Sequence, residues 1–295
     1  MIDPDAVVAT LDGAEDDLLD SEMRSLLLHH GRRTARVVVL LHGLTASPRA
    51  WREFAGVRFA RGETVLVPRL PRHGHQDRMT DALAGLHADE LRESGRRILD
   101  AAAALGDEIV VVGFSLGGAL ALHVAHGDAR VGRAIAVAPF LGLLALPHDW
   151  HAFARNLLER TPNRFLYWNP IDKGRGLPEH GYARYTTRAL AAGLALADAL
   201  RADARAGPPR ARHVEIVRNA SETSVNNRTI DDLVERWRAV GGERVRVHRL
   251  VGLGPSHDVI EPERPRAPAL RFLPHLHALL DGPPADRDLT IDARQ

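Results

Sequence analysis

The chain of 295 residues contains no cysteine, is 45% hydrophobic and carries a formal net charge of +1. This composition suits one large α/β domain; it excludes disulfides, thiolate metal sites and a cysteine nucleophile, and it argues against a surface built to bind nucleic acid. No apolar run approaches the length of a membrane span and no secretory signal opens the chain, so we expect a cytoplasmic protein that acts on a small, uncharged molecule.

Strand and helix patterns alternate through the first half of the chain. Residues 1–36 carry no clear pattern, and we expect an edge strand or a covering helix there. Continuous apolar runs predict buried strands at Val37–Leu41, Thr64–Val67, Glu108–Val112 and Arg133–Ala138. Helices are predicted after Ser47, over Ala88–Leu105 and from Gly118 onward. The alternation predicts an open, mostly parallel sheet with helices on both faces.

The alternation breaks between Leu141 and Arg212, where amphipathic segments replace clear strands. Half of the chain's fourteen aromatic residues lie in this range, namely Trp150, Phe153, Phe165, Tyr167, Trp168, Tyr182 and Tyr185. We interpret residues 141–212 as a helical cap or lid over an apolar pocket, with Trp168 and Tyr185 as substrate-binding residues. The alternative is that these rings only pack the cap's own small core.

The sheet pattern resumes after the cap, so we expect residues 1–140 and 213–295 to form one core domain. Strands are predicted at His213–Val217 and Arg244–Val251, and helices over Ile230–Val240 and Pro268–Leu280. Residues Asp281–Gln295 have the composition of a frayed tail.

The most informative stretch lies where the strand ending at Val112 meets Gly113-Phe114-Ser115-Leu116-Gly117. A serine hydroxyl is a poor nucleophile, so an acyl-transfer enzyme exposes it beside a base on a sharp turn from strand to helix. Glycines two residues to either side of Ser115 avoid a collision across such a turn. Ser115 is therefore the candidate nucleophile; the alternative is an ordinary glycine-rich turn.

His257 is the candidate general base. Among sixteen histidines it alone lies in a glycine-containing loop directly after the last predicted strand, far downstream of Ser115. Loops at the carboxyl ends of parallel strands meet at one edge of the sheet, so the two side chains can approach each other. The alternative is a solvated loop histidine.

Two histidine pairs, His73 with His75 and His123 with His126, have spacings that could suit a metal, but neither is accompanied by the further ligands of a zinc pattern. No glycine-rich nucleotide-binding motif is present either. We expect neither a metal nor a cofactor.

Four motifs together resemble the α/β-hydrolase superfamily, in its serine esterase and monoacylglycerol-lipase-like branch. They are Leu41-His42-Gly43-Leu44, the loop ending at His73-Gly74-His75, Gly113–Gly117, and Ser256-His257-Asp258. The resemblance spans residues 37–280, with the cap only loosely comparable. It implies the chain order nucleophile, acid, histidine, and an oxyanion hole from the backbone N–H groups of Leu44 and Leu116. His42 is expected to shape the oxyanion turn and not to act as a base.

The acid departs from the resembled branch. That branch usually carries aspartate in the loop after the penultimate core strand, and Glu222 occupies the matching place here. Glutamate can serve, since the acid only orients the imidazole and stabilises imidazolium. Asp231 and Asp232 are rivals, but they fall in the first turn of the next helix, where carboxylates often serve the helix dipole.

These residues predict a serine hydrolase that cleaves carboxylic esters with Ser115, His257 and Glu222. A thioesterase, amidase or peptidase could use the same side chains, and a non-catalytic member of the fold could bind a small ligand in the same pocket. We call the sharp turn Gly113–Gly117 the elbow. Epoxide hydrolases and haloalkane dehalogenases are disfavoured because their elbow carries aspartate in place of serine.

Overall fold

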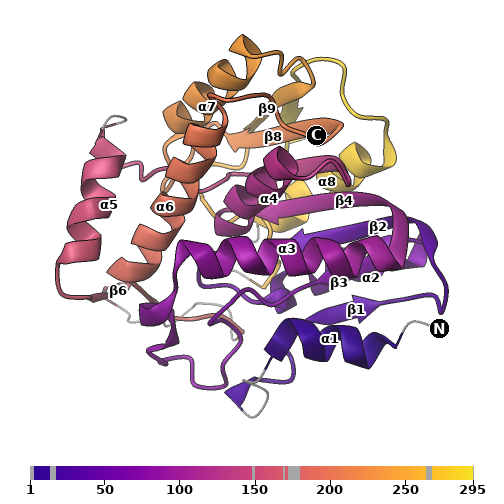
Figure 1. Cartoon of the computed structure of the whole chain (residues 1–295), viewed down its shortest axis with the longest axis horizontal. Coiled ribbons are helices and arrows are strands. Elements are labelled where there is room, and N and C mark those ends of the chain that lie inside the picture. The colour runs from indigo at the N-terminus through magenta and orange to yellow at the C-terminus, as the bar shows by residue number, and fades with distance from the viewer. Residues whose placement is uncertain are drawn as a thin grey trace.

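The centre of the molecule is an eight-stranded sheet with the order β1-β3-β2-β4-β5-β8-β9-β10 (Figure 1). The computed structural model describes residues 3–13, 18–147, 150–168, 170–171, 180–263 and 268–294. Neighbouring strands of this sheet run parallel except β1, which is antiparallel to β3. The strands are β1 (Leu26–Leu28), β2 (Thr34–Leu41), β3 (Thr64–Val67), β4 (Gly106–Phe114), β5 (Val131–Val137), β8 (His213–Asn219), β9 (Val245–Val251) and β10 (Thr290–Asp292).

Helices cover both faces of the sheet, as the sequence predicted. They are α1 (Pro4–Asp12), α2 (Arg52–Ala60), α3 (Ala88–Leu105), α4 (Leu116–Gly127), α5 (His151–Arg160), α6 (Thr187–Asp203), α7 (Asn227–Ala239) and α8 (Pro268–Asp281). On the face toward the viewer in Figure 1, α3 and α4 pack against each other and against β2 and β4. On the opposite face, α2 and α8 meet where the rings of Phe54 and His277 stack 4.0 Å apart.

The apolar runs of the central strands are buried on both sides. Val38 pairs with Val110, and Val111 pairs with Ala134; none of the four is more than 1% exposed. Strands that lie between two helical layers bury both of their faces, which explains the continuous runs in place of alternation. The sheet therefore holds its carboxyl-terminal edge as a rigid base for the loops that follow it.

A strand from the N-terminal region and a strand from the C-terminal region both join the sheet. The N-terminal region forms α1 and, in β1, the edge strand that was one of two expectations. The expected frayed tail is wrong for Thr290–Asp292, because β10 pairs parallel with β9. The backbone N–H of Leu289 also donates to His248 Nδ1 at 3.1 Å. Three residues are too short for a strand pattern to be recognised in the sequence, and it is the pairing that defines the element.

The range 141–212 contains α5, a small antiparallel hairpin and α6. The hairpin pairs β6 (Phe165–Tyr167) with β7 (Arg184–Thr186), although no clear strand was predicted here. Helix α6 packs against α5 on one side and against α3 and α4 on the other. Residues 148–149, 169 and 172–179 of this range lie outside the described residues. The boundaries of a cap at 141 and 212 stay a prediction.

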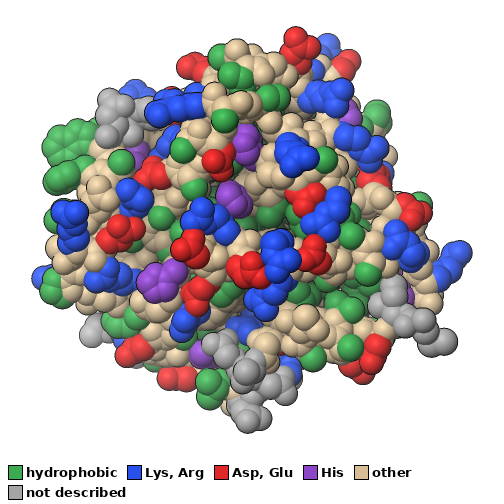
Figure 2. Space-filling model, in the orientation of Figure 1, with side chains coloured by type: hydrophobic (Ala, Val, Ile, Leu, Met, Phe, Trp, Pro, Cys, Tyr) green, Lys and Arg blue, Asp and Glu red, His purple; other side chains and the backbone are tan. Residues whose placement is uncertain are grey.

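Charged side chains of both signs are interspersed on the face shown in Figure 2. On α3, for example, Arg96 pairs with Glu93 at 2.6 Å and with Asp100 at 2.8 Å. Within the described part of the chain, none of the helices has both the length and the apolar character required to cross a membrane.

Candidate active site

Ser115 lies between the end of β4 and the start of α4 in a strained backbone conformation. Its φ is 52° and its ψ is −114°, a combination that non-glycine residues rarely adopt. Hydrogen bonds hold it there: the Ser115 N–H donates to the carbonyl of Val137 at 3.0 Å, and the Ser115 carbonyl accepts from the N–H groups of Ala119 and Phe140. The turn thus presents the side chain above the carboxyl end of the sheet.

The two glycines of the elbow are required by close backbone approach. A Cβ on Gly113 would lie 2.1 Å from the carbonyl oxygen of Gly117. A Cβ on Gly117 would lie 2.3 Å from the carbonyl oxygen of Leu41, at the end of β2. Contacts below 3.0 Å to backbone are not tolerated, so only glycine fits either position.

The structure brings Ser115, His257 and Glu222 together from three loops. His257 Nε2 lies 2.8 Å from Ser115 Oγ, and His257 Nδ1 lies 2.9 Å from Glu222 Oε1. Glu222 follows β8 and His257 follows β9, while Ser115 follows β4. With Nδ1–H donated to the carboxylate, Nε2 is the acceptor that can take the serine proton.

The Glu222 carboxylate is anionic and almost enclosed. Its side chain is 2% exposed, and Oε1 also accepts from the backbone N–H groups of Thr223 and Ser224, each at 2.8 Å. Burial alone would raise the pKa of Glu222, but the hydrogen bond and charge of His257 and the two backbone donors hold that pKa below its usual value. The carboxylate therefore keeps the negative charge that an imidazolium needs beside it.

The two rival carboxylates lie elsewhere in the structure. Asp231 pairs with Arg218 at 2.6 Å, and Asp232 pairs with Arg236 at 2.9 Å, one turn along α7. Both carboxylates therefore form ion pairs. The expectation that they lie in the first turn of the helix is wrong, because α7 begins at Asn227 and its first turn contains no acidic residue.

His42 orients the peptide that carries the Leu44 N–H. His42 Nδ1 lies 2.9 Å from the carbonyl oxygen of Gly43, and its Nε2 accepts from the N–H of Leu70 at 3.1 Å. The Gly43 carbonyl and the Leu44 N–H belong to one planar peptide and point in opposite directions, so the His42 bond fixes the direction of that N–H. Burial lowers the pKa of His42 well below its usual value, in keeping with a neutral ring that donates through Nδ1 only.

Leu116, the second expected oxyanion donor, is the first residue of α4. Its backbone N–H belongs to the group of N–H donors that have no carbonyl partner one turn back, and it lies at the partially positive end of the helix. Leu44 lies on the cavity wall with Ser115.

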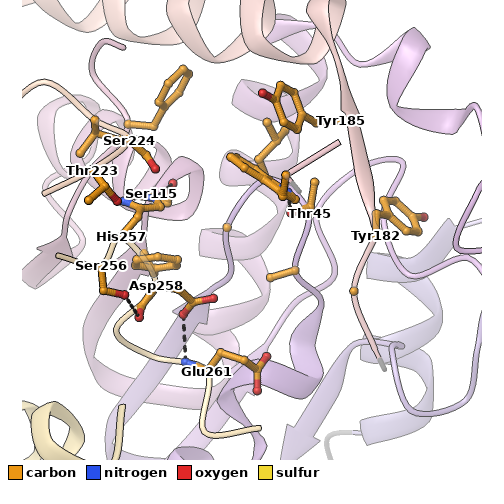
Figure 3. A pocket seen from close by; sticks show the side chains of 18 of the residues that line it. Thr45, Ser115, Tyr182, Tyr185, Thr223, Ser224, Ser256, His257, Asp258 and Glu261 are labelled. Atoms are coloured by element: carbon orange, nitrogen blue, oxygen red, sulfur yellow. Dashed lines mark hydrogen bonds between the residues drawn. The ribbon is translucent and has the colours of Figure 1, made fainter. Parts of the chain in front are cut away.

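A cavity of about 550 Å³ opens beside Ser115 and His257 (Figure 3), a size common for small-molecule sites. Trp168 and Tyr185 both line it, with ring centroids 4.4 Å apart. Further lining residues are Gly43, Leu44, Thr45, Ala46, Phe114, Phe140, Leu143, Gly181, Tyr182, Leu190, Thr223, Ser224, Val225, Ser256, Asp258 and Glu261. Thr45 was not singled out in the sequence, although it directly follows the oxyanion motif.

At least one histidine of each pair has a hydrogen-bond partner within the protein. His73 Nδ1 lies 2.8 Å from the carbonyl of Pro71 and its Nε2 faces the carbonyl of Leu44, next to the oxyanion turn. His126 Nδ1 accepts from Trp237 Nε1 at 3.1 Å. Within the described ranges no group of three or more His, Asp or Glu is placed to hold a metal ion.

Comparison with known families agrees with this fold. The model of the alpha/beta hydrolase family matches residues 38–272, which is most of the chain and covers part of each half of the predicted core. The chain therefore belongs to the alpha/beta hydrolase family. A search of curated proteins gave no significant match.

Several solved structures share the fold at low sequence identity. One reported for LipS and LipT, two metagenome-derived lipolytic enzymes, has a TM-score of 0.65 at 19% identity, covering 89% of this chain and 99% of that one. The monoacylglycerol lipase of Paleococcus ferrophilus has a TM-score of 0.63 at 16% identity, with 87% and 95% covered. A soluble variant of the monoglyceride lipase of Saccharomyces cerevisiae has a TM-score of 0.63 at 13% identity, with 88% and 90% covered.

Proposed function

We propose that the protein is a serine hydrolase that cleaves carboxylic esters through an acyl-enzyme intermediate. The observation that carries the proposal is the continuous line of hydrogen bonds from Ser115 Oγ through His257 to Glu222, at 2.8 and 2.9 Å. Distances in this range are what a nucleophile, its base and the orienting acid need.

Ester cleavage follows from these positions in two steps. Ser115 Oγ attacks the ester carbonyl while His257 Nε2 takes its proton; the C–O bond to the alcohol then breaks, and His257 returns the proton to the departing alkoxide. Water, deprotonated by the same nitrogen, hydrolyses the acyl-serine and releases the acid. The N–H groups of Leu44 and Leu116 stabilise the oxyanion in both steps, with no rearrangement because the backbone holds them.

We propose the remaining assignments on the same basis. Residues 141–212 form the cap, residues 1–140 and 213–295 form the core, and the cap side chains Trp168 and Tyr185 contact the substrate. The cavity walls combine aromatic and aliphatic side chains with hydroxyl groups, which suits a small ester.

A thioester, an amide or a peptide could undergo the same acyl transfer. The ester is favoured because similar structures include lipolytic enzymes and monoacylglycerol lipases. A second candidate is a non-catalytic protein that binds a small ligand in the same cavity. The strained serine argues against it, since a strained backbone is costly to keep where no chemistry depends on it.

The first prediction tests the nucleophile. Ser115→Ala should lower kcat for p-nitrophenyl acetate by about 10³-fold or more, because the lost hydroxyl forms the covalent bond. Ser224→Ala is a matched control: Ser224 also lines the cavity, and its contact with Glu222 is made by the backbone N–H. Thermal unfolding of both variants should match the parent protein. Unchanged turnover in Ser115→Ala would end the serine-hydrolase proposal.

A further inference from the structure

One part of the cavity wall combines aromatic surface with hydroxyl groups. Trp168 Nε1–H donates to Thr45 Oγ1 at 2.7 Å, and the rings of Trp168 and Tyr185 lie 4.4 Å apart at an interplanar angle of 42°. All three residues line the cavity. We call Thr45, Trp168 and Tyr185 the polar arm.

The proton of the Thr45 hydroxyl remains free to be donated. A hydroxyl has one proton to give and two lone pairs to offer. The indole N–H of Trp168 occupies one lone pair of Thr45 Oγ1, so the hydroxyl proton must point away from the indole. Across the described ranges of the chain, no protein group accepts it.

The proton of the Tyr185 hydroxyl is also free to be donated. No hydrogen bond joins it to any residue that the structure describes, and its ring is half-buried against Trp168. Burial raises the pKa of Tyr185, so the hydroxyl stays protonated and remains a donor.

The position of these hydroxyls links them to the reacting ester. Thr45 directly follows Leu44, the proposed oxyanion donor, and its carbonyl accepts from the N–H of Tyr182 at 2.8 Å. In Figure 3, Thr45 and Tyr185 lie together on one side of Ser115 and His257. A substrate bound at Ser115 can therefore place either its acyl group or its alcohol group between Thr45 and Tyr185.

A hydrocarbon group bound against the polar arm would leave the hydroxyl groups of Thr45 and Tyr185 without a hydrogen-bond acceptor. Covering a donor without supplying an acceptor costs roughly 1–3 kcal/mol, whereas an oxygen at the same place restores the hydrogen bond that water provided. This part of the cavity wall therefore favours a substrate with an oxygen atom at this place over one of similar shape with a hydrocarbon group there.

We infer that the polar arm binds a part of the substrate that carries a hydrogen-bond-accepting oxygen, as an ether, hydroxyl or carbonyl group. This inference rests on the proposed ester hydrolysis and deepens it by naming the kind of substrate. Thr45 and Tyr185 donate to that oxygen. Besides contacting the substrate, Trp168 is a positioning residue for this hydrogen bond, because its N–H turns the Thr45 hydroxyl proton away from the indole.

Two matched pairs of esters test the inference: one pair varies the acyl group of the substrate and the other varies the alcohol group. The acyl pair is p-nitrophenyl hexanoate and p-nitrophenyl 3-ethoxypropanoate; the alcohol pair is pentyl butyrate and 2-ethoxyethyl butyrate. In each pair an ether oxygen replaces one methylene. The measured quantity is kcat/KM for the ether ester divided by kcat/KM for the alkyl ester. This ratio is divided by the ratio of the two rate constants for alkaline hydrolysis without enzyme, which removes the difference in intrinsic reactivity.

In at least one pair, Thr45→Val and Tyr185→Phe should each lower this ratio by about 10-fold, the scale of one hydrogen bond. Tyr182→Phe is the matched control, because the Tyr182 hydroxyl already accepts from the His75 N–H and donates to the Arg72 carbonyl. It should leave the ratio unchanged. Equal ratios in the parent protein, Thr45→Val and Tyr185→Phe for both pairs would overturn the inference.

A double variant separates positioning from packing. Trp168→Phe should lower the ether preference, and combining it with Thr45→Val should lower it no further than Thr45→Val alone. Additive losses would show that Trp168 acts through its surface, which would contradict its positioning role. Labelling of Ser115 by a fluorophosphonate in every variant distinguishes failure of the polar arm from failure of the proposed hydrolase, since only the latter abolishes labelling of the parent protein.

Discussion

The side chain of Glu222 folds back over its own loop. One oxygen, Oε1, accepts from His257 and from the backbone N–H groups of the next two residues, Thr223 and Ser224. Glutamate is one methylene longer than the aspartate usual in the resembled branch. Folding back takes up this extra length, so the carboxylate still meets the imidazole at hydrogen-bond distance.

Glu222→Gln should reduce kcat by up to about 10⁴-fold, the scale seen when a triad acid becomes an amide. The amide keeps the shape but removes the charge that stabilises imidazolium. Asp231→Asn should change kcat little, because Asp231 pairs with Arg218. Steady-state kinetics on one ester measure both. A crippled Asp231→Asn beside a near-normal Glu222→Gln would place the acid on α7 and refute our assignment.

Single residues were predictable where their chemistry depends on local sequence. Ser115 was recognisable because the elbow imposes glycines at fixed distances, and His257 because its loop follows a strand. Glu222 needed the resemblance to fix its place among several carboxylates. The role of Thr45 depends on Trp168, which lies more than a hundred residues away in the chain; such a tertiary contact leaves no pattern in one sequence.

Elements were predictable where their patterns are long. The runs in β2 and β4 are buried on both faces, and α3 repeats its apolar residues at helical spacing over 18 residues. The three-residue strands β6, β7 and β10 escaped because pairing with a neighbour, and not their own sequence, makes them strands. The elbow has a pattern that is visible in the sequence and also a contact that is not. Its glycines form a local motif, and Gly117 packs against the end of β2.

Gly117→Ala should destabilise the protein by about 3 kcal/mol or more, because the added methyl would collide with the carbonyl of Leu41. Gly127→Ala, at the last residue of α4, meets no atom within 4 Å and should be neutral or stabilising by up to about 1 kcal/mol. Urea unfolding compares the two. Equal stability of the two variants would show that β2 and α4 are not as close as described.

A buried ionic network joins strands of the sheet to the C-terminal segment of the chain. Glu215 on β8 accepts from Arg133 on β5 at 2.6 Å and from His248 on β9 at 2.8 Å. Arg133 also donates to the carbonyl of Gly282 after α8, and His248 accepts from Leu289 before β10. The network thus ties three central strands to the C-terminal segment, which the sequence alone did not place.

Glu215→Gln should cost about 3 kcal/mol at pH 7, because it leaves the buried Arg133 guanidinium without its counter-charge. Glu93→Gln, which breaks an exposed pair with Arg96, should leave stability unchanged. Chemical denaturation gives both values, and a Glu215→Gln protein as stable as Glu93→Gln would contradict the role of the network.

The stabilising effect of Glu215 should also depend on pH. Burial alone would raise the pKa of Glu215, but the hydrogen bonds from His248 and Arg133 hold it below the usual 4.5 in the folded state. The unfolded chain therefore takes up the proton first, and the Glu215 contribution is lost as pH falls below about 4.5. The difference in stability between parent and Glu215→Gln should narrow there; a constant difference from pH 7 to pH 3 would contradict this.

The measurement that tests the central claim most directly is the mass of the protein after reaction with a fluorophosphonate. A serine activated by His257 and Glu222 attacks the phosphorus, expels fluoride and forms a stable covalent adduct. We predict one adduct per chain, located on the peptide that contains Ser115, and none in Ser115→Ala. No adduct in the folded parent protein, or an adduct on another serine, would contradict the claim that Ser115 is the nucleophile.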